Sequence, residues 1–157
     1  MSRGRRVLTA LALTLAVGAL SAGVALAAPG GAGTVSLTDH FSGVIDQEHT
    51  TNPCTNAPGE LTLTATNAVE HVTFNANGFW ATFTAEGTAT FAPDDNSPVA
   101  SGHFTVWDGE NGNLQNHTAT GTFTVHIDGV RMRETFHESV SPSGISISFD
   151  KPALTCG

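Results

Sequence analysis

The sequence predicts an all-β protein, an antiparallel meander of seven or eight strands that closes into a small barrel, with a two-sheet β-sandwich as the alternative. Three observations predict this class. Apolar residues recur at every second position, as in half-buried strands, and not at helical spacing. Only 13% of the 157 residues are charged while glycine and threonine are abundant, which suits turns and pleated surfaces. Connections are short, which favours antiparallel neighbours, and several long strands carry internal glycines, which favours closure.

The N-terminal segment has the pattern of a cleavable export signal. Residues 1–6 contain three arginines and no acid, and an uncharged stretch follows at Val7–Ala27. The stretch ends in Ala-Leu-Ala, the small-x-small pattern that signal peptidase recognises, so we expect cleavage after Ala27 rather than an uncleaved membrane anchor. The sequence therefore predicts a signal peptide at 1–27 and a single secreted domain at 28–157.

Export would make the balance of charge more acidic. The full chain has a net charge of −8, from six basic and 14 acidic residues. Three of the basic residues belong to the signal, so the secreted domain would keep three basic and 14 acidic residues, a net charge of −11. Such a surface repels nucleic acid and anionic membranes. We therefore expect an uncharged or cationic partner, a small molecule or a carbohydrate, and no cofactor.

The two cysteines, Cys54 and Cys156, predict one disulfide bond. Export places them in an oxidising compartment, where disulfides persist. The chain has no other cysteine, so the pairing is unambiguous, and no Cys-x-x-Cys motif points to a metal or redox site. The bond would fasten the C-terminal tail to an early loop.

The first strands are expected at Thr34–Val44 and in a long bent hairpin, residues 60–76 and 79–92. The Asn77-Gly78 dipeptide predicts a type I′ turn that would pair Phe74 with Ala81. Apolar residues change from odd to even positions along the first arm of this hairpin. The change predicts a β-bulge near Asn67-Ala68, opposite Gly87.

The later strands follow from the same rules. The next is expected at Val99–Asp108, with loops at residues 93–98 and 108–113, and the last at Ile145–Asp150. Between them, Asp128-Gly129 predicts a second type I′ hairpin in which Val125 lies opposite Met132. In that register three polar residues point inward with the apolar ones: His117, Glu134 and Glu138.

These inward polar residues predict a ligand site. A carboxylate buried without a partner is costly, so inward acids suggest a wet cavity or an end of the barrel that is open to solvent. The expected site is a small-molecule pocket lined by Glu134, Glu138, His117, Phe123, Met132 and Phe136. The alternative is that Glu138 lies at the rim in water and Glu134 hydrogen-bonds a neighbouring strand.

Two tryptophans, Trp80 and Trp107, are expected on the exterior, where they could contact a sugar or a protein. The alternative is that another segment covers them. The seven histidines are dispersed by the period of the strands, so no metal site is expected. Phosphate-loop, nucleophile-elbow and catalytic-triad patterns are missing, so no catalytic residue is assigned and a hydrolase is not expected.

The first functional hypothesis is therefore a secreted protein that binds a small apolar or amphipathic ligand without catalysing a reaction. The second is an extracellular carbohydrate- or protein-binding module that uses Trp80 and Trp107. The third is a barrel isomerase or cyclase in which Glu134 or Glu138 serves as general acid and base.

Overall fold

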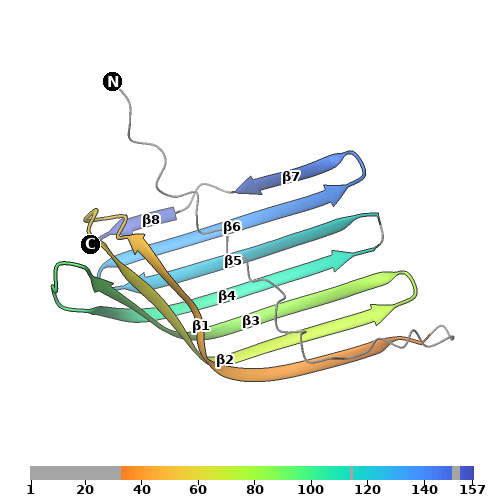
Figure 1. Ribbon diagram of the computed structural model, residues 1–157, viewed down its shortest axis with the longest axis horizontal. Helices are drawn as coiled ribbons and strands as arrows, with labels where there is room; N and C mark the ends of the chain where they lie inside the picture. Colours follow the sequence, from red (N-terminus) through yellow and green to blue (C-terminus); the bar gives the residue numbers. More distant parts are fainter. Residues whose placement is uncertain (1–32, 114, 150–152) are drawn as a thin grey trace. The chain divides into compact units, whose positions relative to one another are not determined.

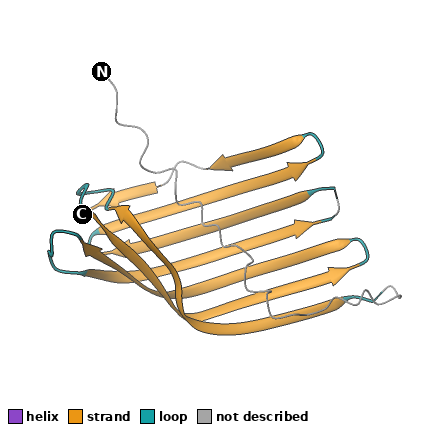
Figure 2. Cartoon of the chain, viewed as in Figure 1, coloured by secondary structure: helices purple, strands orange, loops and turns teal. Residues whose placement is uncertain are grey.

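The protein is a single antiparallel sheet of eight strands in chain order (Figures 1 and 2). The computed structural model describes residues 33–113, 115–149 and 153–157, so the expected signal peptide and its cleavage site lie outside the described residues. Strands β1 to β7 pair with one another in chain order. Strand β8 pairs with the first residues of β6 and β7 with its last residues, so the two short strands follow one another along the same edge of β6. The described residues contain no helix that is long and apolar enough to cross a membrane. The strands are β1 (Val35–Thr51), β2 (Pro58–Asn75), β3 (Gly78–Pro93), β4 (Ala100–Gly112), β5 (His117–Ile127), β6 (Val130–Ser141), β7 (Gly144–Phe149) and β8 (Ala153–Cys156).

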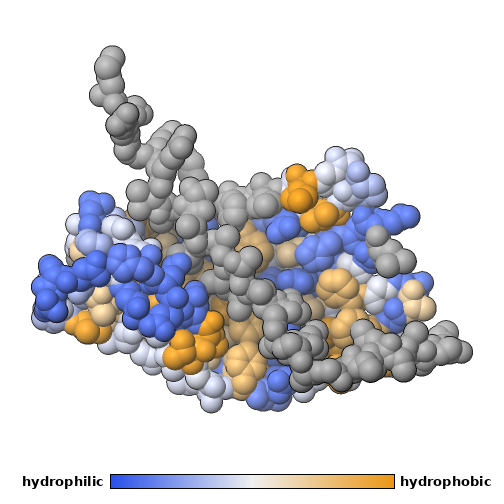
Figure 3. All heavy atoms as spheres, in the orientation of Figure 1, coloured by the Kyte–Doolittle hydropathy of each residue, from blue (hydrophilic) through white to orange (hydrophobic). Residues whose placement is uncertain are grey.

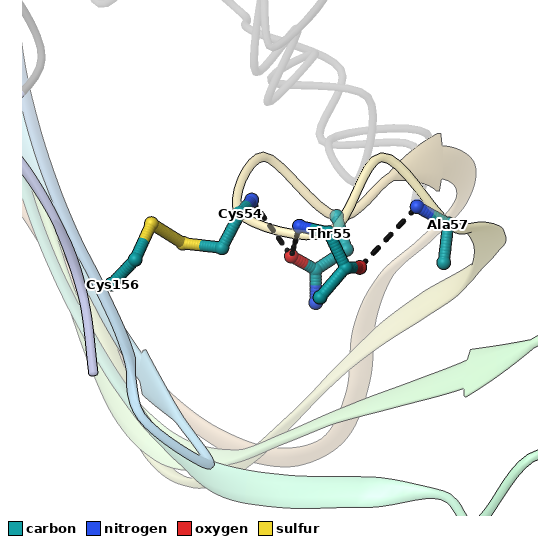
Figure 4. The surroundings of a disulfide bond; sticks show 5 residues. Cys54, Thr55, Ala57 and Cys156 are labelled. Atoms are coloured by element: carbon teal, nitrogen blue, oxygen red, sulfur yellow. Dashed lines mark hydrogen bonds between the residues drawn. A yellow bond between two sulfur atoms is a disulfide. The ribbon is translucent and has the colours of Figure 1, made fainter.

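The disulfide bond between Cys54 and Cys156 is present and shows that the sheet is strongly curled (Figure 4). Cys54 lies in the β1–β2 loop and Cys156 in β8, and five strand-to-strand steps separate β2 from β8. At about 4.8 Å a step, a flat sheet would hold β2 and β8 about 24 Å apart. The two Cα atoms are only 5.7 Å apart. At this end the sheet therefore rolls into a trough.

The predicted closure into a barrel is not confirmed. Within the described residues, β1 pairs only with β2, and no ladder joins β1 to β7 or β8. The all-β antiparallel class and the number of strands agree with the sequence prediction. The Cys54–Cys156 bond, and not a closing ladder, connects the two sides of the sheet.

One face of the curled sheet, which we call the inner face, carries the core. Alternation along β3 and β5 sends apolar side chains to it and threonines to the other, outer face, and pairing continues these two faces through the neighbouring strands. Leu63 and Phe104 are almost fully buried, at 2% and 1% exposure. The buried apolar residues of the inner face are Leu61, Leu63, Ala65, Ala68, Val72, Ala85, Ala89, Phe91, Phe104, Val106, Ala119, Phe123, Val125, Ile127 and Met132.

The second hairpin has the predicted register. Val125 pairs with Met132, and the turn residues Asp128 and Gly129 both have positive φ, 38° and 82°. A type I′ turn requires this conformation at both of its central positions, and its twist matches that of the flanking strands. The turn chemistry alone therefore positions every side chain along β5 and β6.

The first hairpin differs from the prediction by two residues. The turn is centred on Ala76-Asn77, so Phe74 pairs with Phe79 and not with Ala81. The reason is local, because the Asn75 side-chain oxygen accepts a hydrogen bond from the Asn77 N–H at 2.8 Å and stabilises an earlier turn. A shift of two residues keeps every side chain on its predicted face.

The predicted bulge in β2 is present, and glycines allow the sheet to bend beside it. The register shifts between Ala65 and Asn67, and Ala65 pairs with Gly87. A Cβ atom at Gly87 would collide with the Thr64 carbonyl, and a Cβ at Gly102 would collide with the His126 carbonyl. Glycine is needed at both positions because neighbouring backbones approach closely there.

Candidate ligand-binding face

The six residues predicted to form a ligand site all lie on the inner face, but they do not form one cluster. Phe123 and Met132 are part of the packed core. Phe136 lies over Gly121 of β5, where its ring occupies the space that a side chain would take. Glu134 pairs with Phe123 and Glu138 with Ala119 across β5, and both glutamates are half-buried. The polar members therefore follow β6 toward its end, where His117 begins β5.

The structure adds two acidic residues at and beyond the end of the predicted strand Val99–Asp108. Strand β4 continues to Gly112, so Asp108 lies within the strand and not at its end, and Glu110 belongs to the strand and not to the predicted loop at residues 108–113. Both alternate onto the inner face, where Asp108 pairs with Gly121 and Glu110 with Ala119. The spacing of two between Phe104, Val106, Asp108 and Glu110 is the pattern that could have predicted the longer strand. The polar, glycine-rich composition of the segment is typical of a loop, but pairing with β3 and β5 keeps the segment extended.

Asp108 is the most unusual group of the inner face. It is only 9% exposed, and its Oδ1 atom has no hydrogen-bond partner among the described residues. Burial, followed by the nearby charge of Glu110, raises the pKa of Asp108 to about 6, while the Gly109 amide and His117 act in the opposite direction. Asp108 therefore changes its charge close to neutral pH.

His117 and Glu110 stand beside Asp108 and complete a small polar cluster. The His117 Nε2 atom lies 3.5 Å from Glu110 Oε2. The imidazole is stacked on Phe79 with ring centroids 6.0 Å apart. The charges of Glu110 and His117 both act on Asp108, which couples the three residues of the polar cluster. The cross-strand neighbours of Asp108 are Phe83 and Gly121.

Acidic side chains occur along the whole inner face, whereas the arginines of the described range lie on the outer face. Arg131 and Arg133 alternate onto the outer face of β6. In the view of Figure 3, hydrophobic patches lie among hydrophilic ones on one side of the sheet. The inner face is therefore both apolar and strongly negative. Its described acidic residues are Asp39, Asp46, Glu48, Glu70, Asp108, Glu110, Glu134 and Glu138.

A second buried carboxyl oxygen without a partner lies nearer the disulfide. Glu48 pairs with Leu61, and its Oε1 atom has no hydrogen-bond partner in the described part of the chain. Burial and then the charge of Asp46 raise the pKa of Glu48. This segment of β1 was not predicted as strand, because its acidic residues interrupt the apolar alternation.

Both tryptophans lie on the outer face, each 46% exposed. Trp80 pairs with Asn111 and makes an edge contact with His71, with ring centroids 5.7 Å apart. Trp107 lies four residues before Asn111 on β4, and a Cβ atom added at Gly109 would lie 3.2 Å from its indole. Neither ring is covered by the described residues.

The described residues contain no group of three or more histidine, cysteine or acidic side chains that could hold a metal ion. The role of Glu134 or Glu138 as a general acid and base stays a prediction.

Glu134→Gln tests whether the acids of the inner face are held in an apolar environment. Burial raises the pKa of Glu134, so the wild-type protein keeps this contribution to stability at low pH and loses it as the pH rises through the folded-state pKa. We expect the variant to be more stable than wild type at pH 8, by less than about 1 kcal/mol because the group is partly exposed, and equal to it at pH 4. Urea unfolding at both pH values measures this difference. An equal difference at pH 4 and pH 8 would contradict the expectation.

Comparison of the chain with protein-family models, with curated proteins and with solved structures finds no match.

Proposed function

We propose that the protein binds a small amphipathic molecule on its inner face, with an amine of the ligand at Asp108 and Glu110. The observation that carries the proposal is the buried Oδ1 atom of Asp108, which has no partner in the described residues. A buried acceptor of this kind is costly unless a donor reaches it. An ammonium group supplies both the donor and the opposite charge.

The charge of the inner face supports a cationic ligand over an anionic one. Glu138 lies in the same cross-strand row as Glu110, separated by Ala119 of β5, so the two strands that carry the acids are about 10 Å apart. Glu70 lies in the next row, that of Asp108, and Glu134 lies one row further along β6, so both extend the negative charge away from the Glu110–Glu138 row in the same direction. An anion would meet repulsion along the trough, whereas an amine would be attracted to it.

The aromatic residues next to the cluster support an apolar body on the same ligand. Phe83 and Phe136 are half-buried in the cross-strand row of Asp108. They can pack against a hydrocarbon or a ring while the amine reaches the carboxylates. We also propose that the trough closes into a barrel around this ligand. The disulfide supports the proposed site of action, outside the cell.

Three probes of one shape test the proposal by calorimetric titration: phenethylamine, 2-phenylethanol and 3-phenylpropionate. We expect the amine to bind most tightly, the alcohol weakly and the carboxylate not at all. Affinity for the amine should decrease as the pH falls from 7 to 5, because protonation of Asp108 near pH 6 removes its charge.

Matched variants locate the binding. Glu110→Gln is expected to weaken amine binding at least tenfold, which corresponds to about 1.4 kcal/mol. Glu86→Gln is the control, because Glu86 is exposed on the outer face. Equal binding of the amine and the carboxylate, or an equal loss in both variants, would refute the proposal.

A further inference from the structure

A pocket lies at the end of the sheet that is remote from the disulfide, between the β2–β3 turn and the β4–β5 loop. Its volume is about 260 Å³. Thr73, Trp80 and Asn111 form one cross-strand row on the outer face, and Thr118 of β5 continues it. The residues that line this turn-end pocket are Thr73, Asn75, Asn77, Gly78, Phe79, Trp80, Asn111, Gly112, Asn113, Asn116, His117 and Thr118.

The chemistry of the turn-end pocket differs from that of the inner face. Five asparagines and two threonines line it, and no carboxylate does. The indole of Trp80 supplies a flat apolar surface beside these amides, and nearly half of it is exposed. Amides donate and accept hydrogen bonds without charge, so the pocket suits a ligand with many hydroxyl groups and an apolar ring face.

Both walls of the turn-end pocket are held by local hydrogen bonds. The Asn75 side-chain oxygen accepts from the Asn77 N–H at 2.8 Å. On the other wall, the Asn113 side-chain oxygen accepts from the N–H groups of Gln115 and Asn116 at 2.8 and 2.9 Å. The backbone N–H of Asn113 also donates to the Asn116 carbonyl at 2.8 Å. These bonds use the amide oxygens of Asn75 and Asn113, so their NH₂ groups are available as donors. They also fix the two asparagine side chains in place before a ligand binds.

We infer that the turn-end pocket binds a neutral saccharide whose ring stacks on Trp80 and whose hydroxyl groups bond the surrounding asparagine amides. The volume is just below the range of about 300–1,000 Å³ that is typical of drug-sized ligands, so the pocket fits one small ring. The inference does not depend on the proposed amine site, because Trp80, Asn75 and Asn111 lie on the outer face. Of the polar cluster of the inner face, His117 alone also lines the pocket. A peptide is the less suitable occupant, because apart from His117 the lining offers no ionisable group to pair with its charges.

Tryptophan fluorescence tests this inference directly. The chain contains two tryptophans, so Trp107→Phe leaves Trp80 as the only indole and its emission reports on the turn-end pocket. Trp80→Phe is the matched control, because Trp107 has the same exposure and does not line the pocket. The probes are neutral di- and trisaccharides of glucose, galactose, mannose, xylose and N-acetylglucosamine. We expect a saturable change with at least one of them in Trp107→Phe and none in Trp80→Phe.

Affinity measurements on variants complete the test. Trp80→Ala and Asn111→Ala should each lower the affinity for that saccharide at least tenfold, whereas Trp107→Ala should leave it unchanged. Both pocket residues are exposed, so the variants should fold, and thermal unfolding checks this. No emission change with any probe, an equal change in Trp80→Phe, or binding of an acidic peptide in place of the saccharides would overturn the inference. Retention of amine binding by Trp80→Ala would show that the two sites are separate.

Discussion

Replacement of both Cys54 and Cys156 by serine is expected to lower the free energy of unfolding by about 4 kcal/mol. The bond closes a loop with a sequence separation of 102 residues, and the chain-entropy model assigns about 4.7 kcal/mol to a loop of about 100 residues. Residual structure in the unfolded chain reduces this figure somewhat. Urea unfolding of the variant and the wild type under oxidising conditions measures the difference.

The same substitution should release β8 before the rest of the sheet. Strand β8 has four residues, all exposed, and pairs only with β6. Amide hydrogen exchange should show loss of protection in β8, while β4 and β5 keep theirs until global unfolding. Wild-type protein treated with a reductant is the control and should behave like the variant. Unchanged stability together with protected β8 amides would show that strand pairing alone holds the trough.

Asp108→Asn is expected to stabilise the protein by about 2 kcal/mol at pH 8 while abolishing amine binding. The pKa of Asp108 is about 6 in the folded protein, against 3.8 for an aspartate that is free in water. Because the folded state binds this proton more tightly, the stabilising contribution is full below about pH 4 and is lost as the pH rises through 6. The difference between these two pKa values corresponds to a loss of stability of at most about 3 kcal/mol, and partial solvation of the carboxyl group reduces this loss.

The Asp108→Asn variant should therefore match wild type near pH 4 and exceed it increasingly up to about pH 7. Urea unfolding across this range gives the two curves. Glu86→Gln on the outer face is the control for removing one negative charge from the acidic chain. If Glu86→Gln produced the same dependence on pH, overall charge and not the burial of Asp108 would be the cause.

Local turn chemistry explains which parts of the fold could be predicted from the sequence. Asp128-Gly129 strongly favours a type I′ turn and no competing turn residue precedes it, so the predicted register of β5 and β6, and with it the positions of Glu134 and Glu138, was correct. The hairpin at Asn77-Gly78 was less determined, because Asn75 offered a competing turn. The alternation of apolar residues still placed the side chains on their correct faces.

The segments that the sequence analysis missed are those whose extended structure depends on neighbouring strands. The second half of β1 and the end of β4 have polar residues on both faces, and only pairing with β2, β3 and β5 makes them strands. Of the acids that distinguish the candidate site, Glu110 lies in one of these segments, and Asp108 lies where it begins, at the end of the predicted strand. Ile145, the first residue of the predicted strand Ile145–Asp150, is 68% exposed, because β7 lies at an edge of the sheet.

The most direct test of the account is an NMR titration of the Asp108 side-chain carboxyl carbon in the free protein and in the presence of saturating phenethylamine. We expect a pKa of about 6 for Asp108 in the free protein. With the amine, we expect this pKa to decrease by at least about one pH unit, because an adjacent positive charge favours the carboxylate. A pKa of Asp108 that is the same with and without phenethylamine would contradict the proposed amine site.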